Sequence, residues 1–170
     1  MNTVHLHLLL NHLPVVGTII AVVLLAYALA RRSDELVRTG FGMLVVLALV
    51  AGAVYLTGEP AEEAVEGLAD VSEARIERHE EAALTATILL GAVGVVALGG
   101  LLTLRGDAAR TRRVGRLVLV LALVPTAAMG YAAYLGGQIR HSEIRPGAVP
   151  VESESGPVTE GGGATSGERG

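Results

Sequence analysis

Histidine is the residue type in this sequence that is best suited to chemistry, because the chain has five histidines and no cysteine. Neutral imidazole is a common ligand of metal ions and of haem iron, whereas the lack of cysteine excludes disulfides and thiolate sites. The histidines are far apart in the sequence, and each falls near the start or end of a long apolar block: His5, His7, His12, His79 and His141. The elements formed by these blocks must therefore position them.

The apolar blocks are long enough to cross a membrane. Of the 170 residues, 51% are hydrophobic and only 18% are charged. A spanning helix needs about 20 predominantly apolar residues, and four segments qualify, at about 11–30, 39–57, 80–104 and 114–137. We predict an all-α integral membrane protein, an antiparallel four-helix bundle in residues 1–145, followed by a disordered tail in residues 146–170. This composition argues against a water-soluble globule and against a nucleic-acid-binding protein.

The arginines predict the orientation of the bundle. All 13 basic residues are arginine, and eight of them lie in the two short connections at 31–38 and 105–116. Positively charged connections stay on the cytoplasmic side, so both termini are expected on the outer side. Of the 17 acidic residues, 14 fall on that outer side, which thus carries a net charge of −9 against +5 on the inner side. All five histidines are then expected on the outer side.

Two of the histidines have helical neighbours that allow them to face the bundle interior. His79 shares a helix face with small residues at spacings of three, four and seven, and His12 shares one with Val15, Val16 and Ile19. His7 instead stacks with Asn11, and Pro14 predicts that the first helix kinks or begins near it.

Three interpretations of the histidines stay open from spacing alone. Two inward histidines on different helices are sufficient to hold a b-type haem. Three or four histidines with a carboxylate would suit a zinc, copper or non-haem iron ion. Alternatively, these polar residues only cap helix ends or contact water. The carboxylates that fall on the same side and could complete an ion site are Glu59, Glu62 and Glu80.

Two short motifs resemble an uncharacterised family of predicted four-helix bacterial membrane proteins, the family designated domain of unknown function 2231. The segment from His7 to Pro14 is similar to the signature that opens span one in that family, and Gly136 to His141 is similar to its closing segment. The stretches 57–63 and 79–84 fall where members often carry Gly and His. Some relatives are fused to Rieske-type iron–sulfur domains, so the resemblance implies the bacterial cytoplasmic membrane and a link to respiratory electron transfer.

The leading hypothesis from these observations is a small membrane redox protein that binds haem b near the outer leaflet and exchanges electrons with quinol or an external partner. The first expected ligands are His12 and His79, the alternatives are His7 and His141, and Asn11 and Glu80 could bond to a ligating imidazole. A membrane protein that binds a zinc, copper or iron ion through His12, His79, His141, Glu59, Glu62 or Glu80 is the second hypothesis. A cofactor-free accessory subunit of a membrane complex is the third. We find no catalytic motif, and we do not predict an enzyme.

Overall fold

The computed structural model describes residues 3–58, 72–104, 106–141 and 144–146, and within them every regular element is helical. The elements are α1 (Thr3–Leu10), α2 (His12–Ala30), α3 (Asp34–Leu56), α5 (Glu73–Thr103) and α6 (Ala108–Arg140). The predicted all-α class is therefore confirmed. The tail that we predicted to be disordered lies, from residue 147 onward, outside the described residues.

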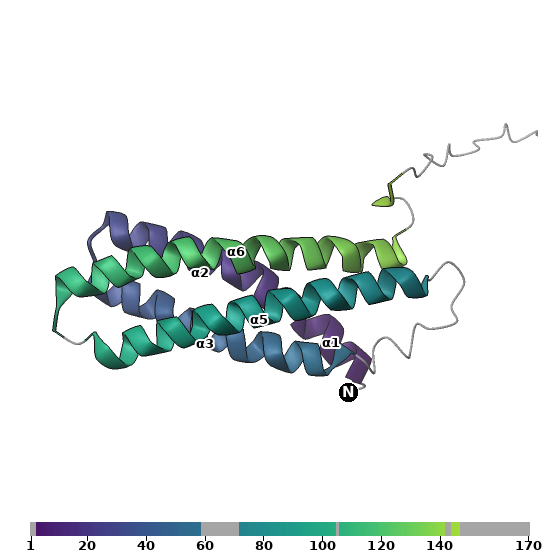
Figure 1. Cartoon of the computed structure of the whole chain (residues 1–170), viewed down its shortest axis with the longest axis horizontal. Helices are drawn as coiled ribbons and strands as arrows, with labels where there is room; N and C mark the ends of the chain where they lie inside the picture. The colour runs from purple at the N-terminus through teal and green to yellow at the C-terminus, as the bar shows by residue number, and fades with distance from the viewer. Residues whose placement is uncertain (1–2, 59–71, 105, 142–143, 147–170) are drawn as a thin grey trace, which may run out of the picture.

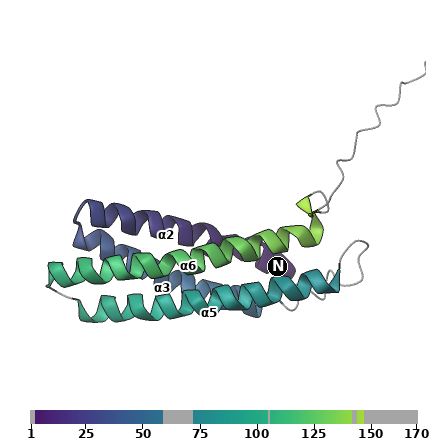
Figure 2. The same ribbon diagram turned by 45° about the horizontal axis from the view of Figure 1, so that its top comes forward.

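The four long helices form an antiparallel bundle, as Figures 1 and 2 show. Each long helix packs mainly against two neighbours, in the cyclic order α2, α3, α5, α6, with a smaller contact between α3 and α6, and the short α1 packs against α2 and α3. Residues 31–33 and 104–107 connect helices at one end, which we call the connection end. The opposite end, the terminus end, holds α1, the end of α3, the start of α5 and the end of α6 (Figure 1).

All four long helices are long and apolar enough to cross a membrane, with candidate spans at His7–Ala30, Asp34–Leu56, Glu73–Thr103 and Ala108–Ile139. In each of these helices, only 28–33% of the most apolar stretch of 18 residues is buried inside the bundle. Large apolar side chains therefore cover the outer surface, and Leu49 is 71% and Val95 is 70% exposed. Such a surface is stable in lipid and not in water, which indicates a multi-pass membrane protein.

The helices are longer than the apolar segments because capped, charged turns extend them. Ser33 begins α3, and its hydroxyl accepts a hydrogen bond from the Leu36 backbone N–H at 3.3 Å. Asp107 begins α6 in the same way and accepts from the Arg110 N–H at 2.9 Å. These caps satisfy backbone donors that a helix start leaves free. Hence α3 begins five residues before the predicted start at 39, and α6 begins six before 114.

The first helix, which we expected to kink or begin near Pro14, is interrupted three residues earlier, at Asn11. Asn11 separates α1 from α2, yet its backbone is helical and its N–H bonds to the His7 carbonyl at 2.9 Å. Pro14 falls in the first turn of α2, where its missing N–H breaks no bond within α2. The segment before Pro14 is therefore free to be helical, as α1 is. On this helical backbone, the side chains of His7 and His12 point in different directions.

The bundle core lets helices approach closely where glycine faces a neighbour. Its largest fully buried side chains include Phe41, Leu25, Leu44 and Leu90. A Cβ atom added at Gly94 of α5 would lie 2.7 Å from the Cβ of Ala48 on α3, and one added at Gly100 would lie 2.7 Å from Cε2 of Phe41. Small residues at helix contacts are typical of membrane bundles, where close van der Waals packing drives association.

Candidate functional site

The terminus end of the bundle brings together two histidines that are 72 positions apart in the sequence, His7 of α1 and His79 of α5. Both of their helices, α1 and α5, pack against α3. Each is partly buried, and each bonds to the backbone of another helix. We call this pair the imidazole pair.

His79 is held against α6 through a gap in that helix's side chains. Its Nδ1 atom lies 2.9 Å from the backbone oxygen of Ala132. In a helix, the side chain of a residue partly covers the backbone carbonyl of the residue four positions before it. For the Ala132 carbonyl the covering residue would be Gly136, which has no side chain. A Cβ atom added at Gly136 would lie 3.0 Å from Cε1 and 3.2 Å from Nδ1 of His79. The lack of a side chain at Gly136 is therefore what gives the imidazole access to the Ala132 carbonyl.

His7 caps the carboxyl end of α3. Its Nδ1 atom lies 3.2 Å from the backbone oxygen of Val54 and 3.2 Å from Oγ1 of Thr57. The Thr57 hydroxyl itself donates to the Val54 carbonyl at 2.8 Å. The last carbonyls of a helix have no partner within it, and His7 together with Thr57 satisfies one of them.

These contacts determine the tautomer of each neutral ring. A carbonyl oxygen only accepts hydrogen bonds, so Nδ1 must carry the proton in both His7 and His79. The Nε2 atom of each ring then keeps its lone pair. Histidines that bind metals are typically oriented in this manner, with one nitrogen donating to a backbone carbonyl and the other bound to the metal.

His12, which the sequence analysis favoured as a ligand beside His79, is positioned differently. Its side chain is exposed, and its Nδ1 atom lies 3.2 Å from the Leu8 backbone oxygen, one turn earlier in the chain. Val16 and Ile19, with which His12 shares a face, are about half exposed, which shows that this face points outward. At this end the structure therefore has His7, one of the two alternatives, and His79 partly buried, whereas His12 is exposed.

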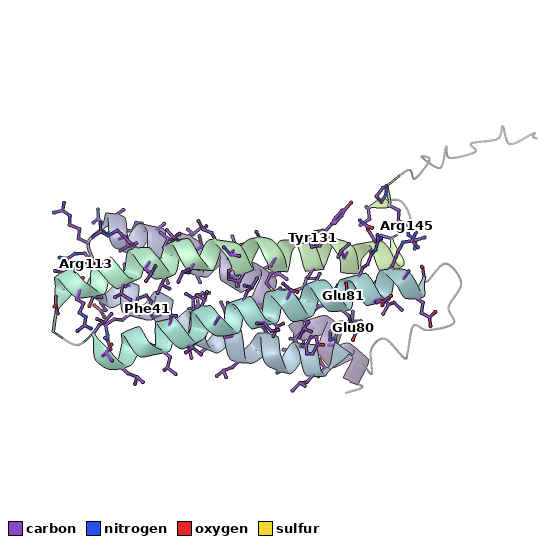
Figure 3. All side chains as sticks on the ribbon, in the orientation of Figure 1. Phe41, Glu80, Glu81, Arg113, Tyr131 and Arg145 are labelled. Atoms are coloured by element: carbon purple, nitrogen blue, oxygen red, sulfur yellow. The ribbon has the colours of Figure 1, made fainter. Side chains whose placement is uncertain are left out.

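The other candidate residues divide into exposed groups and groups outside the description. His141 and Glu80 are exposed at the same end of the bundle, and Figure 3 shows Glu80 beside Glu81 on α5. Glu59, Glu62 and the side chain of His5 lie outside the described residues. Within the described part of the chain, no three His, Asp or Glu side chains are close enough together to hold a metal ion.

Asn11 contributes a buried acceptor at this end. It lies one helical turn after His7, and no donor in the described residues reaches its Oδ1 atom, which is buried. A buried polar atom without a partner is unfavourable by about 1–3 kcal/mol. This atom is consequently available to a water molecule or to a polar group of a ligand.

Three contributors to the site were not identified from the sequence: the carbonyl of Ala132, the carbonyl of Val54 and the hydroxyl of Thr57. Backbone acceptors leave no signal in their own residue types, so the Val54 carbonyl could not be found. Gly136 does leave a signal, because a glycine inside an apolar helix exposes the carbonyl four residues before it. Gly136 thus indicates that a donor on a neighbouring helix can bond to the Ala132 carbonyl.

Comparisons of the chain with family models, with curated proteins and with solved structures gave no match.

Proposed function

We propose that this chain is a multi-pass redox protein of the bacterial cytoplasmic membrane that holds one b-type haem through the imidazole pair, His7 and His79. The arginine distribution supports an orientation with the terminus end on the outer side, since the connection end carries most of the arginines. In this orientation the haem lies near the outer leaflet, where quinol or an external electron-transfer partner can reach it. The resemblance to a family linked to respiratory electron transfer supports the same proposal.

The observation that carries the proposal is that both imidazoles are oriented by backbone acceptors on other helices, while no donor among the described residues bonds to either Nε2 atom. Side chains that merely face water have no need of such fixed orientation. An axial ligand does need it, because a rigid imidazole with a hydrogen-bonded Nδ1–H is a stronger and better-aligned donor.

The number of donors favours haem over a bare metal ion. Structural and catalytic ions take three or four protein ligands, whereas the described part of this end supplies two imidazoles. A porphyrin brings four nitrogens of its own, so two axial histidines complete its iron. Asn11 offers a buried acceptor for a polar group of the haem. When bound, the haem would supply one-electron transfer.

Absorption spectra of the purified protein, expressed with added haem precursor, test the proposal. The unchanged chain should show a Soret band and the α and β bands of a six-coordinate reduced haem. His7→Asn and His79→Asn should abolish this spectrum. Asparagine is the informative replacement because its amide N–H can still reach the backbone carbonyl while offering iron no imidazole. His12→Asn is the matched control and should keep the spectrum.

Metal analysis of the same sample separates the two kinds of centre. Iron in a one-to-one ratio with haem supports the proposal, while stoichiometric zinc or copper without a Soret band would replace it with an ion-binding function. A protein that contains neither haem nor metal after expression with haem supply would refute both.

A cofactor-free role has one specific observation in its favour, which is that an arginine, a side chain that does not ligate iron, also caps a helix end here. Arg145 donates to the carbonyls of Gln138 and Ile139 at 3.0 and 3.1 Å, and thus caps α6 as His7 caps α3. If the histidines act only as caps, His7→Asn and His79→Asn should leave stability nearly unchanged, and no spectrum should exist to be lost.

A further inference from the structure

The connection end of the bundle carries exposed arginines that have no partner within the described residues. Two arginines here are used internally: Arg38 donates to the backbone oxygens of Leu104 and Leu101, and Arg112 forms an ion pair with Asp34 at 2.9 Å. The remaining described arginines of this end are exposed and make no ion pair or hydrogen bond with their side chains: Arg31, Arg32, Arg110, Arg113 and Arg116. Figure 3 shows Arg113 at this end, with Arg145 at the opposite one.

Helix packing places four of these arginines at adjacent ends of two helices, α2 and α6. A Cβ atom added at Gly115 of α6 would lie 3.2 Å from Cδ2 of Leu29 on α2. The end of α2 and the first turns of α6 thus approach each other closely. Arg31 and Arg32 follow Leu29 by two and three residues, and Arg113 and Arg116 flank Gly115. We call these four side chains the arginine patch.

Each half of the arginine patch continues into an exposed apolar stripe. On α6, Leu117 and Val120 follow Arg113 at spacings of four and seven, and both are more than half exposed. On α2, Tyr27 and Val23 precede Arg31 at spacings of four and eight, and both are also more than half exposed. Positive charge above apolar surface on the same helix faces matches a lipid, with its phosphate at the charges and its acyl chains along the stripes.

The backbone of Arg32 is a second, independent observation. The Arg32 N–H bonds to the Leu29 oxygen at 3.2 Å and the Ser33 N–H to the Ala28 oxygen at 3.0 Å, which ends α2 in a Schellman motif. Arg32 occupies the left-handed position of this motif with φ 54°. Glycine is usual there because a side chain is strained in that region. An arginine therefore occupies a position where the fold favours glycine.

We infer that the arginine patch binds the headgroup of an anionic phospholipid in the leaflet that faces the connection end. Guanidinium groups bind phosphate oxygens in a bidentate manner, and the strained Arg32 is explained if its charge serves binding and not folding. The inference rests on membrane insertion and is independent of haem binding.

The test uses the full chain in neutral detergent, with phosphatidylglycerol or phosphatidylcholine added to the micelles. We expect phosphatidylglycerol to raise the thermal unfolding temperature and to co-purify with the protein, and phosphatidylcholine to do neither. An arginine near an anionic lipid surface contributes about a five-fold gain in affinity. Arg113→Gln should therefore lower retention of phosphatidylglycerol about five-fold. Arg78→Gln, which changes an exposed arginine at the terminus end, is the matched control and should change nothing.

Arg32→Gly separates binding from folding, since the two effects have opposite signs. Without added lipid, this variant should be at least as stable as the unchanged chain, because glycine relieves the left-handed strain. It should nevertheless retain less phosphatidylglycerol. Equal retention of both lipids by the unchanged chain, or unchanged retention by Arg32→Gly and Arg113→Gln, would overturn the inference. An equal rise of unfolding temperature with soluble glycerol phosphate would overturn it too, since a free anion and not a lipid would then be the ligand.

Discussion

Replacing Gly94 by alanine should loosen the contact between α3 and α5. The added methyl group would lie 2.7 Å from the Cβ atom of Ala48, with the Leu44 backbone oxygen at 3.7 Å and the Val45 Cα at 3.9 Å. A Cβ atom has no torsion through which it can move away, so one helix backbone must shift. The perturbation therefore acts on the helix contact as a whole and not on a single side chain.

The magnitude follows from two opposing effects. Inserting a methyl group into a packed contact costs about 1–3 kcal/mol. Replacing glycine by alanine inside a helix gains about 0.5–1 kcal/mol. Gly91 lies three residues earlier on α5, and a Cβ atom added there meets nothing within 4 Å. Gly91→Ala thus carries the helix-propensity gain alone, and the difference in unfolding free energy between the two variants should be about 1–3 kcal/mol.

Pulse proteolysis in mixed micelles of neutral detergent and dodecyl sulfate measures this difference, because it reports loss of the bundle and not of the helices. A second substitution sharpens the test: Ala48→Gly removes the methyl group that Gly94→Ala meets, and it should restore most of the lost stability. Equal stability of the Gly94→Ala and Gly91→Ala variants, or no rescue by Ala48→Gly, would refute the close approach of α3 and α5.

The other predictions concern the core and the connection end. Phe41→Ala should cost about 3 kcal/mol of unfolding free energy. This is the low end of the range for water-soluble cores, because the unfolded reference state in a membrane is not hydrated. Leu49→Ala on the outer surface should change the unfolding free energy by less than about 0.5 kcal/mol, and pulse proteolysis measures both variants. Arg38→Gln should cost about 1–3 kcal/mol, because it removes the side-chain donor from the Leu101 carbonyl and leaves the Leu104 carbonyl only the longer bond from the Thr111 hydroxyl. Arg38→Lys should recover only part of this loss, since an ammonium lacks the planar fork; an equally stable lysine variant would show that charge alone suffices. A double-mutant cycle on Asp34 and Arg112, whose side chains are about one third exposed, should give a coupling of about 0.2–1 kcal/mol that falls as salt rises; a larger, salt-independent coupling would contradict a solvent-screened pair.

The architecture could be predicted from the sequence because membrane helices have a strong and local signal. Uninterrupted apolar segments identify the four long helices, and the short connections require α2 with α3, and α5 with α6, to be antiparallel neighbours. The helix ends were predicted less well, since polar residues such as Ser33 and Asp107 extend a helix beyond its apolar part. An apolar window detects the membrane-crossing segment and not the whole helix.

Which histidine side chains are partly buried could be predicted only in part. The small-residue face that contains His79 correctly indicated an inward side chain. His12 and His7 could not be ranked, because the choice depends on the rotation of the first helix about its axis, and that rotation depends on where the helix is interrupted. Pro14 indicated an interruption, but its position in the first turn of α2 is compatible with a helical segment before it. A shift of three residues rotates a helix face by about 60°.

The helix ends also explain which polar groups remain available for chemistry. A helix that ends near the hydrocarbon boundary has carbonyls that water does not reliably solvate, so donors must come from the protein. In this bundle α2 ends in a backbone turn at Ser33, α3 receives His7, α5 receives Arg38, and α6 receives Arg145. An arginine that caps a carbonyl has only donors left over, whereas a histidine that caps through Nδ1 keeps an acceptor at Nε2. Capping by histidine thus stabilises a helix end and leaves a metal ligand free at the same time, which an arginine at the same position could not do.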